Sequence, residues 1–371
     1  MHLLHFFPPP KFLDMPTIAV DLSDRSIKYA ELALTRRGFH LGRFGSKKIE
    51  ANIIDTGEIK KPAELSAILS SLFKPLGVRF VLVSLPEERA YVATLQLPRV
   101  ESAALRSVVE LELPEHIPLS AADVLFDYQV IAPEDRIRRD GIAPDAPTHA
   151  DVVVYAFPRS LAEKYMQVFS DAGLEPVAFE METQALARSL LAASDPSLPT
   201  MIVDFGKTRT TFVIAVGTTV RFTSTVSVAG ESLDAALMKA LDLTASEAEK
   251  VKKEKGMIKG KKNEAVFNAL LPIISAVTDE IERHVLFWNS HAEHVHEAHP
   301  QISKIILAGG DANLIGFKEY VAQKLRIPVS VGNIWMNVST FNEYVPEIPF
   351  NESLGFAAAI GLALRAVRGD A

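Results

Sequence analysis

The sequence predicts an α/β protein made of two similar halves that face each other across a cleft. Two segments carry this prediction. In the segment Met201–Thr211 (MIVDFGKTRTT), an apolar run is closed by Asp204 and Gly206, which indicates a buried strand that ends in a tight turn. Near the start of the chain, the apolar run Ile18–Leu22 contains Asp21 in the same place. A third segment, KIILAGG, predicts a strand that runs into a Gly-Gly turn at the same cleft.

The strands that follow each Asp repeat the same order. In both halves a second strand, a Gly-bearing turn and a third strand come next, so each half begins with a three-stranded meander. The predicted strands are Ile27–Leu34 and Phe39–Ile49 in the first half, Thr211–Val216 and Val220–Val228 in the second, and Lys304–Gly310 before a helix at Asn313–Lys324.

The residue types at these turns predict a phosphate and cation site. A carboxylate at a strand end can hold a hydrated cation, and glycine lets the backbone approach a phosphate, whose oxygens accept hydrogen bonds from turn amides and hydroxyls. The Gly-Gly turn can lie flat against a nucleotide's ribose and base. A single strand–Asp–Gly turn is common and usually structural, so the prediction depends on the two turns occurring together.

Composition narrows the class of protein. With 371 residues, 48% of them hydrophobic, the chain can bury a large core, which we expect to form two or more domains. The formal net charge of −7 argues against a nucleic-acid binder. The absence of cysteine excludes disulfides and Cys-ligated metals and is compatible with a reducing compartment. No apolar run reaches the roughly 18 residues that a membrane-spanning helix needs.

Along the chain, the pattern predicts five segments. Residues 1–16 form an aromatic and proline-rich arm that we expect to dock on the body, because its four large apolar residues are costly to leave in water. The first domain begins with residues 17–81, including an amphipathic helix at Pro62–Leu76. An α+β subdomain is inserted at 82–178, with a polar Pro/Gly loop at 132–150. Residues 179–200 cross as a helix to the second domain, 201–371, whose nucleotide-side subdomain spans about 229–300.

Two polar clusters have a simple structural interpretation. Lysines crowd residues 250–262, and a solvated helix and loop explain them better than a docking patch. Within them, Glu249 and Lys252 lie one helical turn apart and can reach the same ligand. His291, His294 and two further histidines follow at irregular spacing, which fits one tetrahedral metal site poorly, so a polar surface turn is favoured.

The order of these elements resembles the actin-like (ribonuclease H-like) ATPase fold, and within it the PilM family of type IV pilus assembly. The resemblance covers nearly all of residues 17–368. Its motifs are a first phosphate loop (VDLSDRSIKYAEL), the family's inserted helix and strand (ALRSVVELELPEHIPLSAADVLFDYQV), a second phosphate loop (VDFGKTRTTF), a ribose and adenine region (VAGESLDAALMKALDLTASEAEKVKKEKG) and an adenosine motif (KIILAGGDANLIGFKEYVAQKLRIPV).

The resemblance implies ATP and Mg²⁺ as ligands and assigns residues to them. Asp21 and Asp204 would hold the Mg²⁺ through waters, and Glu180 would stand near the attacking water. Cofactor-binding residues would be Asp21, Ser23, Ser26, Lys28, Asp204, Gly206, Lys207, Thr208, Thr210, Gly230, Glu249, Lys252, Gly309 and Gly310.

Three positions depart from the family pattern. Ser23 stands where a glycine is expected, Asp24 adds a negative charge beside the phosphates, and Lys207 replaces a small residue. We therefore expect nucleotide binding with slow hydrolysis at most. The alternatives are a degenerate scaffold without nucleotide, a type II secretion protein and a cell-division, FtsA-like protein, although the packed C-terminal helix lacks the basic amphipathic anchor that the last would need. A small-molecule kinase is disfavoured, because the insertion lacks a catalytic Asp motif.

The implied function is that of a cytoplasmic scaffold at the inner face of the cytoplasmic membrane. Its expected partner is the N-terminal cytoplasmic peptide of a PilN-like inner-membrane protein, bound in a groove bordered by Val92–Leu97, Leu105–Leu113 and the strand that begins at Asp151. The chain would then reach the membrane only through that partner. Pilus motor ATPases form a second implied class of partner, and weak self-association is compatible with the fold.

Overall fold

The computed structural model describes residues 16–35, 38–98, 100–131, 149–192, 198–291, 301–339 and 344–368. The docking predicted for the N-terminal arm falls outside these residues, as do nearly all of the 132–150 loop and the histidines that follow His291.

The first sheet has five strands in the order β10-β6-β1-β2-β3. Strands β1 to β3 form the predicted antiparallel meander, whereas β6 and β10 run parallel to β1. Their bounds are β1 Thr17–Leu22, β2 Ser26–Thr35, β3 Gly38–Lys48, β6 Phe80–Leu85 and β10 Glu175–Met181, and a small hairpin joins β4 Ile54–Asp55 to β5 Glu58–Ile59.

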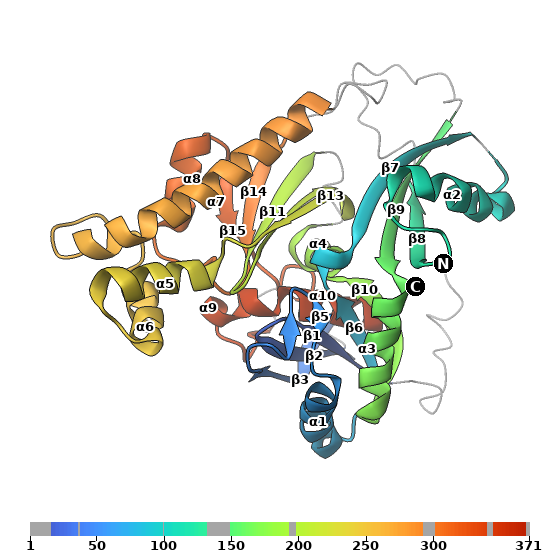
Figure 1. Cartoon of the computed structure of the whole chain (residues 1–371), viewed down its shortest axis with the longest axis horizontal. Coiled ribbons are helices and arrows are strands. Elements are labelled where there is room, and N and C mark those ends of the chain that lie inside the picture. Colours follow the sequence, from blue (N-terminus) through green and yellow to red (C-terminus); the bar gives the residue numbers. More distant parts are fainter. Residues whose placement is uncertain are drawn as a thin grey trace.

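Side-chain alternation along β1 explains why helices cover both faces of this sheet. Ile18 and Val20 point to one face, where they pack with α1 (Pro62–Phe73) and α3 (Arg159–Asp171), while Ala19 points to the other. On that second face lie α4 (Glu182–Leu190) and α10 (Ala357–Arg368). Because α4 also touches the second sheet, this helix pair lies between the two halves (Figure 1).

The second sheet repeats the first, in the order β13-β12-β11-β14-β15. Strands β11 to β13 form the second meander, and β14 and β15 extend it in parallel beside β11. Asp204 in β11 lies opposite Thr211 in β12, just as Asp21 in β1 lies opposite Lys28 in β2. The bounds are β11 Pro199–Phe205, β12 Thr210–Val216, β13 Thr219–Val226, β14 Lys304–Ala308 and β15 Val329–Val331, so the two similar halves predicted from the sequence are confirmed.

Helices α5 (Gly230–Leu241), α6 (Ala245–Lys255), α7 (Glu264–His291) and α8 (Phe317–Leu325) belong to the second half. Capping residues set two of these boundaries. Thr244 caps α6 through a reciprocal pair of bonds with Glu247. The helix predicted at Asn313–Lys324 begins four residues later, because Gly316 adopts a left-handed conformation with φ of 81° before α8. The residues before it stay in turns that line the cleft.

The insertion is a three-stranded antiparallel sheet, β7-β9-β8, with α2 on one face. Its bounds are β7 Tyr91–Pro98, α2 Ser102–His116, β8 Val124–Val130 and β9 His149–Pro158. It also touches the second half, since the Tyr155 hydroxyl donates to the carbonyl oxygen of Val220 at 3.0 Å. Helix α3 and most of β6 and β10 fall in the span 82–178 that the sequence assigns to the insertion, but they belong to or pack with the first sheet.

The last described elements are α9 (Phe350–Ser353), a 3-10 turn and α10, in the part of the chain that the sequence assigns to the second domain. Helix α10 instead packs against β1, β2 and α4, so the end of the chain returns to the first half. The segment Phe350–Arg368 is long and apolar enough to cross a membrane, but 61% of it is buried inside the protein, as expected for a core helix.

Gly361 permits the closest contact in this layer. A Cβ atom added there would lie 1.9 Å from the carbonyl oxygen of Ala185 in α4. We predict that Gly361→Ala destabilises the protein by about 1–3 kcal/mol, because forcing the two helices apart costs more than the alanine gains in helix propensity. Gly355→Ala is the control, since its Cβ would meet only the Lys28 side chain at 3.5 Å. Equal urea midpoints for the two variants would contradict the prediction.

Candidate functional site

A cavity of about 830 Å³ lies between the two halves and is lined by both Asp-bearing turns and by the Gly-Gly turn. Its size falls in the range of small-molecule sites. Most of the residues predicted from the sequence line it. They are Asp21, Ser23, Ser26, Lys28, Asp204, Gly206, Lys207, Thr208, Glu249, Lys252, Gly309 and Gly310.

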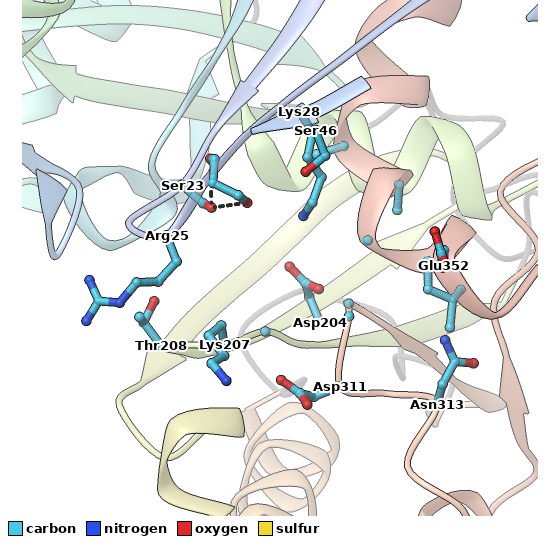
Figure 2. Close-up of a pocket in the computed structure, with 18 of the residues that line it drawn as sticks. Ser23, Arg25, Lys28, Ser46, Asp204, Lys207, Thr208, Asp311, Asn313 and Glu352 are labelled. Atoms are coloured by element: carbon cyan, nitrogen blue, oxygen red, sulfur yellow. Dashed lines mark hydrogen bonds between the residues drawn. The ribbon is translucent and has the colours of Figure 1, made fainter. Parts of the chain in front are cut away.

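Asp21 and Asp204 stand at the ends of the first strands of the two meanders. Asp21 is 4% exposed, and its Oδ1 accepts a 2.9 Å hydrogen bond from Ser84 Oγ at the end of β6. Figure 2 shows Asp204 and Lys28 pointing into the cavity from opposite sides, one from each half. The fold therefore brings together two carboxylates that lie far apart in the sequence.

Burial raises the pKa values of both carboxyl groups. The pKa of Asp21 rises to about 6 and that of Asp204 to about 7, first because burial disfavours the charged form and then because Glu182 adds negative charge nearby. Lys28 and Arg209 oppose both shifts. Two buried carboxyl groups whose charged forms are disfavoured in this way gain from a cation placed beside them.

The first turn, Ser23 to Ser26, is organised by its own hydrogen bonds. Ser23 Oγ donates to the carbonyl oxygen of Ser26 at 3.1 Å (Figure 2). Asp24 turns away from this cavity, and its Oδ1 accepts from the amide of Gly57 at 3.1 Å. The predicted repulsion between Asp24 and a phosphate is therefore not supported by the structure, because the carboxylate points into a second, smaller cavity.

Arg25, between these two residues, forms a salt bridge across the cleft. Its Nε lies 2.7 Å from Glu231 Oε1 at the start of α5 in the second half. Sequence reasoning did not single out this pair, because the two residues are 206 positions apart. The contact holds the mouth of the cleft on one side.

The second turn supplies a cation that is already paired. Lys207 and Thr208 line the cavity, but the Lys207 ammonium contacts Asp234 in α5. Thr210, predicted to contact phosphate, lies outside the cavity: it is fully buried, and its hydroxyl donates to the carbonyl oxygen of Val228 at 2.6 Å. Its role in the structure is to tie β12 to the end of β13.

Lys252, predicted to bind the nucleotide, instead forms ion pairs within the cavity wall. It is 2% exposed, and its Nζ lies 2.6 Å from Asp311 and 2.9 Å from Asp234, with the carbonyl oxygen of Gly230 at 3.4 Å. The ammonium is thus paired with two carboxylates and donates a hydrogen bond to a backbone carbonyl. Lys252 thus anchors α6, α5 and the turn after β14 to one another, whereas Glu249 stays at the cavity surface beside Lys253.

Glycines shape the wall opposite the first turn. Gly309 has φ of 90°, and a Cβ there would lie 2.4 Å from Asp204 Oδ1, whereas Gly310 faces open space. Gly230 is not among the cavity-lining residues, but a Cβ on it would lie 1.9 Å from Asp311 Oδ2. Gly230 therefore acts indirectly, by letting the Asp311 carboxylate approach the first turn of α5.

The prediction for Glu180 is corrected by the structure. Glu180 is buried outside the cavity, bidentate with Arg188 at 2.5 and 2.8 Å, and 3.5 Å from Arg365 on α10. Glu182, the first residue of α4, lines the cavity in its place and accepts a 2.7 Å bond from Arg209. The sequence offered two carboxylates two residues apart where a strand becomes a helix, and their directions depend on that boundary.

The residues present fit a phosphate-bound Mg²⁺ better than a self-sufficient metal site. Within the described ranges, no group of three or more His, Cys, Asp or Glu side chains is placed to hold a metal. Mg²⁺ is commonly held by one or two carboxylates together with substrate phosphates and water. Asp21 and Asp204, with Lys28 close by, match that pattern, and Gly309 and Gly310 leave room for a ligand beside them.

Comparison with known proteins points to one family and one fold. The family described as "Type IV pilus assembly protein PilM" matches residues 19–367. The chain is similar to the solved "PilM-PilN type IV pilus biogenesis complex", with a TM-score of 0.77, 20% identity, and coverage of 95% of this chain and 98% of that chain.

Two other similar structures have lower scores. MreB 5 of Spiroplasma citri bound to AMPPNP has a TM-score of 0.56 and 14% identity over 98% of both chains. Ethanolamine utilization protein EutJ from Carboxydothermus hydrogenoformans has a TM-score of 0.51 and 16% identity over 94% of this chain and 88% of that chain. At these identities the likeness shows the fold alone, and it confirms the predicted actin-like ATPase fold.

The raised pKa of Asp21 predicts how stability depends on pH. A carboxyl group whose pKa is higher in the folded than in the unfolded protein stabilises the fold at low pH, and this contribution is lost as the pH rises toward about 6. Asp21→Asn can keep the bond from Ser84 without the charge. We therefore expect the variant to gain about 1–2 kcal/mol on wild type between pH 4 and pH 7.5 in urea unfolding. A difference that is flat with pH would contradict this expectation.

Proposed function

Since the chain belongs to the PilM family of type IV pilus assembly proteins, we propose that it is an ATP-binding scaffold of the pilus assembly machinery. The observation that carries the proposal is the convergence of Asp21, Asp204 and the Gly309–Gly310 turn on one cavity. Arranged in this way, the two carboxylates would hold Mg²⁺ beside the phosphates, and the glycines would line the nucleotide. In support, the similar MreB 5 structure has AMPPNP bound.

We propose that the chain's own residues divide the work of binding. Lys28, Ser23 and Ser26 would contact phosphate from the first half, while Gly206 and Thr208 would do so from the second. Mg²⁺, when bound, neutralises phosphate charge. Glu249, whose pKa is lowered by the hydrogen bond from Lys253, would accept hydrogen bonds from ribose hydroxyls.

Hydrolysis in this site would be slow. Catalysis of phosphoryl transfer relies on preorganised cations and donors aimed at the developing charge. Here Arg25 is held by Glu231 and Lys207 by Asp234, so each must leave a carboxylate before it can reach a phosphate. In addition, the Arg209 guanidinium, which contacts Glu182, balances the carboxylate best placed to orient a water. Nucleotide binding, more than nucleotide hydrolysis, would therefore be the functional event in this site.

The proposed partner is a PilN-like inner-membrane protein, whose N-terminal cytoplasmic peptide would bind beside the insertion. Two observations support it. The similar solved structure is a PilM-PilN complex. Among the described strands of the insertion, β7 lies at the edge of its sheet, and an edge strand is where an extended peptide can be added. The chain would then work in the cytoplasm, at the membrane only through this partner, with motor ATPases and weak self-association as further contacts.

The nucleotide proposal predicts a specific loss. Asp204→Ala should weaken ATP·Mg²⁺ binding by at least roughly ten-fold in calorimetry, because the cation loses one of its two proposed carboxylate ligands. Asp279→Ala, which removes an exposed carboxylate paired with Lys324 on the outer helices, is the matched control and should bind as wild type does. If purified, nucleotide-free wild type shows neither heat nor a thermal shift at millimolar ATP, the nucleotide site is rejected.

The partner proposal is tested separately. The N-terminal peptide of the inner-membrane protein encoded beside this chain should bind, whereas a scrambled peptide of the same composition should not. Hydrogen exchange should show slower amide exchange along β7 when the peptide is bound, since new main-chain bonds protect an edge strand. If neither the peptide nor the full-length partner is retained by the protein, the pilus-scaffold role fails even when ATP binds.

A further inference from the structure

Arg209 lies between two cavities. It follows the second phosphate turn directly, and its carbonyl oxygen accepts from the amide of Gly206 at 3.0 Å, which closes that turn. Its side chain is 11% exposed and lines both the nucleotide cavity and a second cavity of about 410 Å³. The second cavity is bordered by the strand β13 and by the 3-10 turn Glu87–Arg89 that joins β6 to β7.

The guanidinium is shared between one carboxylate on each side. Its Nη2 donates to Glu182 Oε2 at 2.7 Å, at the nucleotide cavity. Its Nη1 lies 2.9 Å from Glu88 Oε1, at the second cavity. All three side chains are nearly buried, with exposed fractions of 11% for Arg209, 12% for Glu182 and 8% for Glu88.

The charges around Arg209 are therefore linked. Glu182 raises the pKa values of Asp21 and Asp204, and Arg209 lowers them. Burial raises the pKa of Glu88 as well, and Arg209 again opposes the shift. Arg209 thus contributes to balancing both the acids of the cleft floor and the acid at the start of the insertion. A change in charge on either side alters how strongly the other side holds it.

Glu88 lies in the turn between the first sheet and the insertion, so a change in its ion pair can affect the insertion. The turn Glu87–Arg89 is where the chain leaves the first sheet after β6 and enters the insertion at β7. A buried carboxylate that loses its counter-ion must take up a proton or move toward water. Either outcome alters this turn, and with it the base of the edge strand β7.

We propose that Arg209 is a positioning residue that transmits nucleotide occupancy to the insertion, by exchanging Glu88 for a phosphate oxygen when the cleft is filled. A charged phosphate is a strong acceptor for a guanidinium already at the cavity wall. The proposal rests on the nucleotide binding proposed above and adds the residue pair that would link it to the partner-binding insertion. The two states differ in the acceptor that Arg209 chooses, as a ligand-driven switch requires.

Glu88→Gln tests the exchange, because it removes the competing charge and keeps the side chain's size. We expect AMPPNP·Mg²⁺ to bind at least about five-fold more tightly to this variant in calorimetry, since Arg209 is no longer held back. In wild type, the same ligand should change hydrogen exchange at Glu87–Arg89 and along β7. In Glu88→Gln that change should disappear.

Glu87→Gln is the matched control, because Glu87 is buried in the same turn but pairs with Thr183. It should keep wild-type affinity and the exchange response. Arg209→Lys offers a second route: it should bind AMPPNP·Mg²⁺, but lysine lacks the planar fork with which the guanidinium reaches Glu182 and Glu88 on opposite sides, so the response in β7 should be lost. Wild-type behaviour of Glu88→Gln, or identical effects of the two glutamine variants, overturns the exchange alone. Failure of wild type to bind AMPPNP·Mg²⁺ overturns the proposed function and this inference together.

Discussion

The crowding of carboxylates at the floor of the cleft is the constraint on which the rest of the site depends. Asp21 and Asp204 close the first strands of two facing meanders, and Glu182 begins the helix between them, so the fold itself drives three acids together. Only a balancing cation makes this arrangement tolerable in a partly desolvated site. Arg209, in the turn between β11 and β12, provides part of that balance, and Lys28 in β2 provides another part. The pairing is incomplete, since the pKa values of Asp21 and Asp204 remain raised.

The same pairing sets what a phosphate must do to bind. Arg25 holds Glu231 across the mouth, and Lys207 holds Asp234. A phosphate that enters gains these cations only by displacing carboxylates, so the net gain is smaller than the number of basic residues suggests. Lys252, by contrast, is buried and paired with both Asp311 and Asp234, so it joins parts of the cavity wall to one another. The basic residues near the cavity therefore differ in availability although they look alike in the sequence.

Local signals in the sequence were enough for the strands and the two Asp turns, because alternation and Asp-Gly spacing are properties of adjacent residues. The sequence failed where the outcome depends on distant contacts. Glu180 and Glu182 are equivalent in pattern, and only the strand-to-helix boundary at Met181 sends one to Arg188 and the other to the cavity. Thr210 looked like a phosphate ligand beside Thr208, but the register of β12 turns it to Val228. The span 82–178 looked like one insertion in the sequence. In the structure, β6 near its start and β10 near its end belong to the first sheet, because β6 pairs in parallel with both β1 and β10.

The path of the chain gives the insertion contact with both halves and with the cleft floor. Strand β6 ends at Ser84 and Leu85, where Ser84 donates to Asp21 and accepts from the amide of Leu22. Three residues later the chain reaches Glu88, which forms an ion pair with Arg209. The insertion follows, and its Tyr155 and Gln129 donate hydrogen bonds to Val220 and Thr219 of the second half. A movement of one half relative to the other therefore cannot leave the insertion undisturbed, because it is tied to both. A partner bound to this insertion would therefore be coupled to the cleft through packed and hydrogen-bonded contacts.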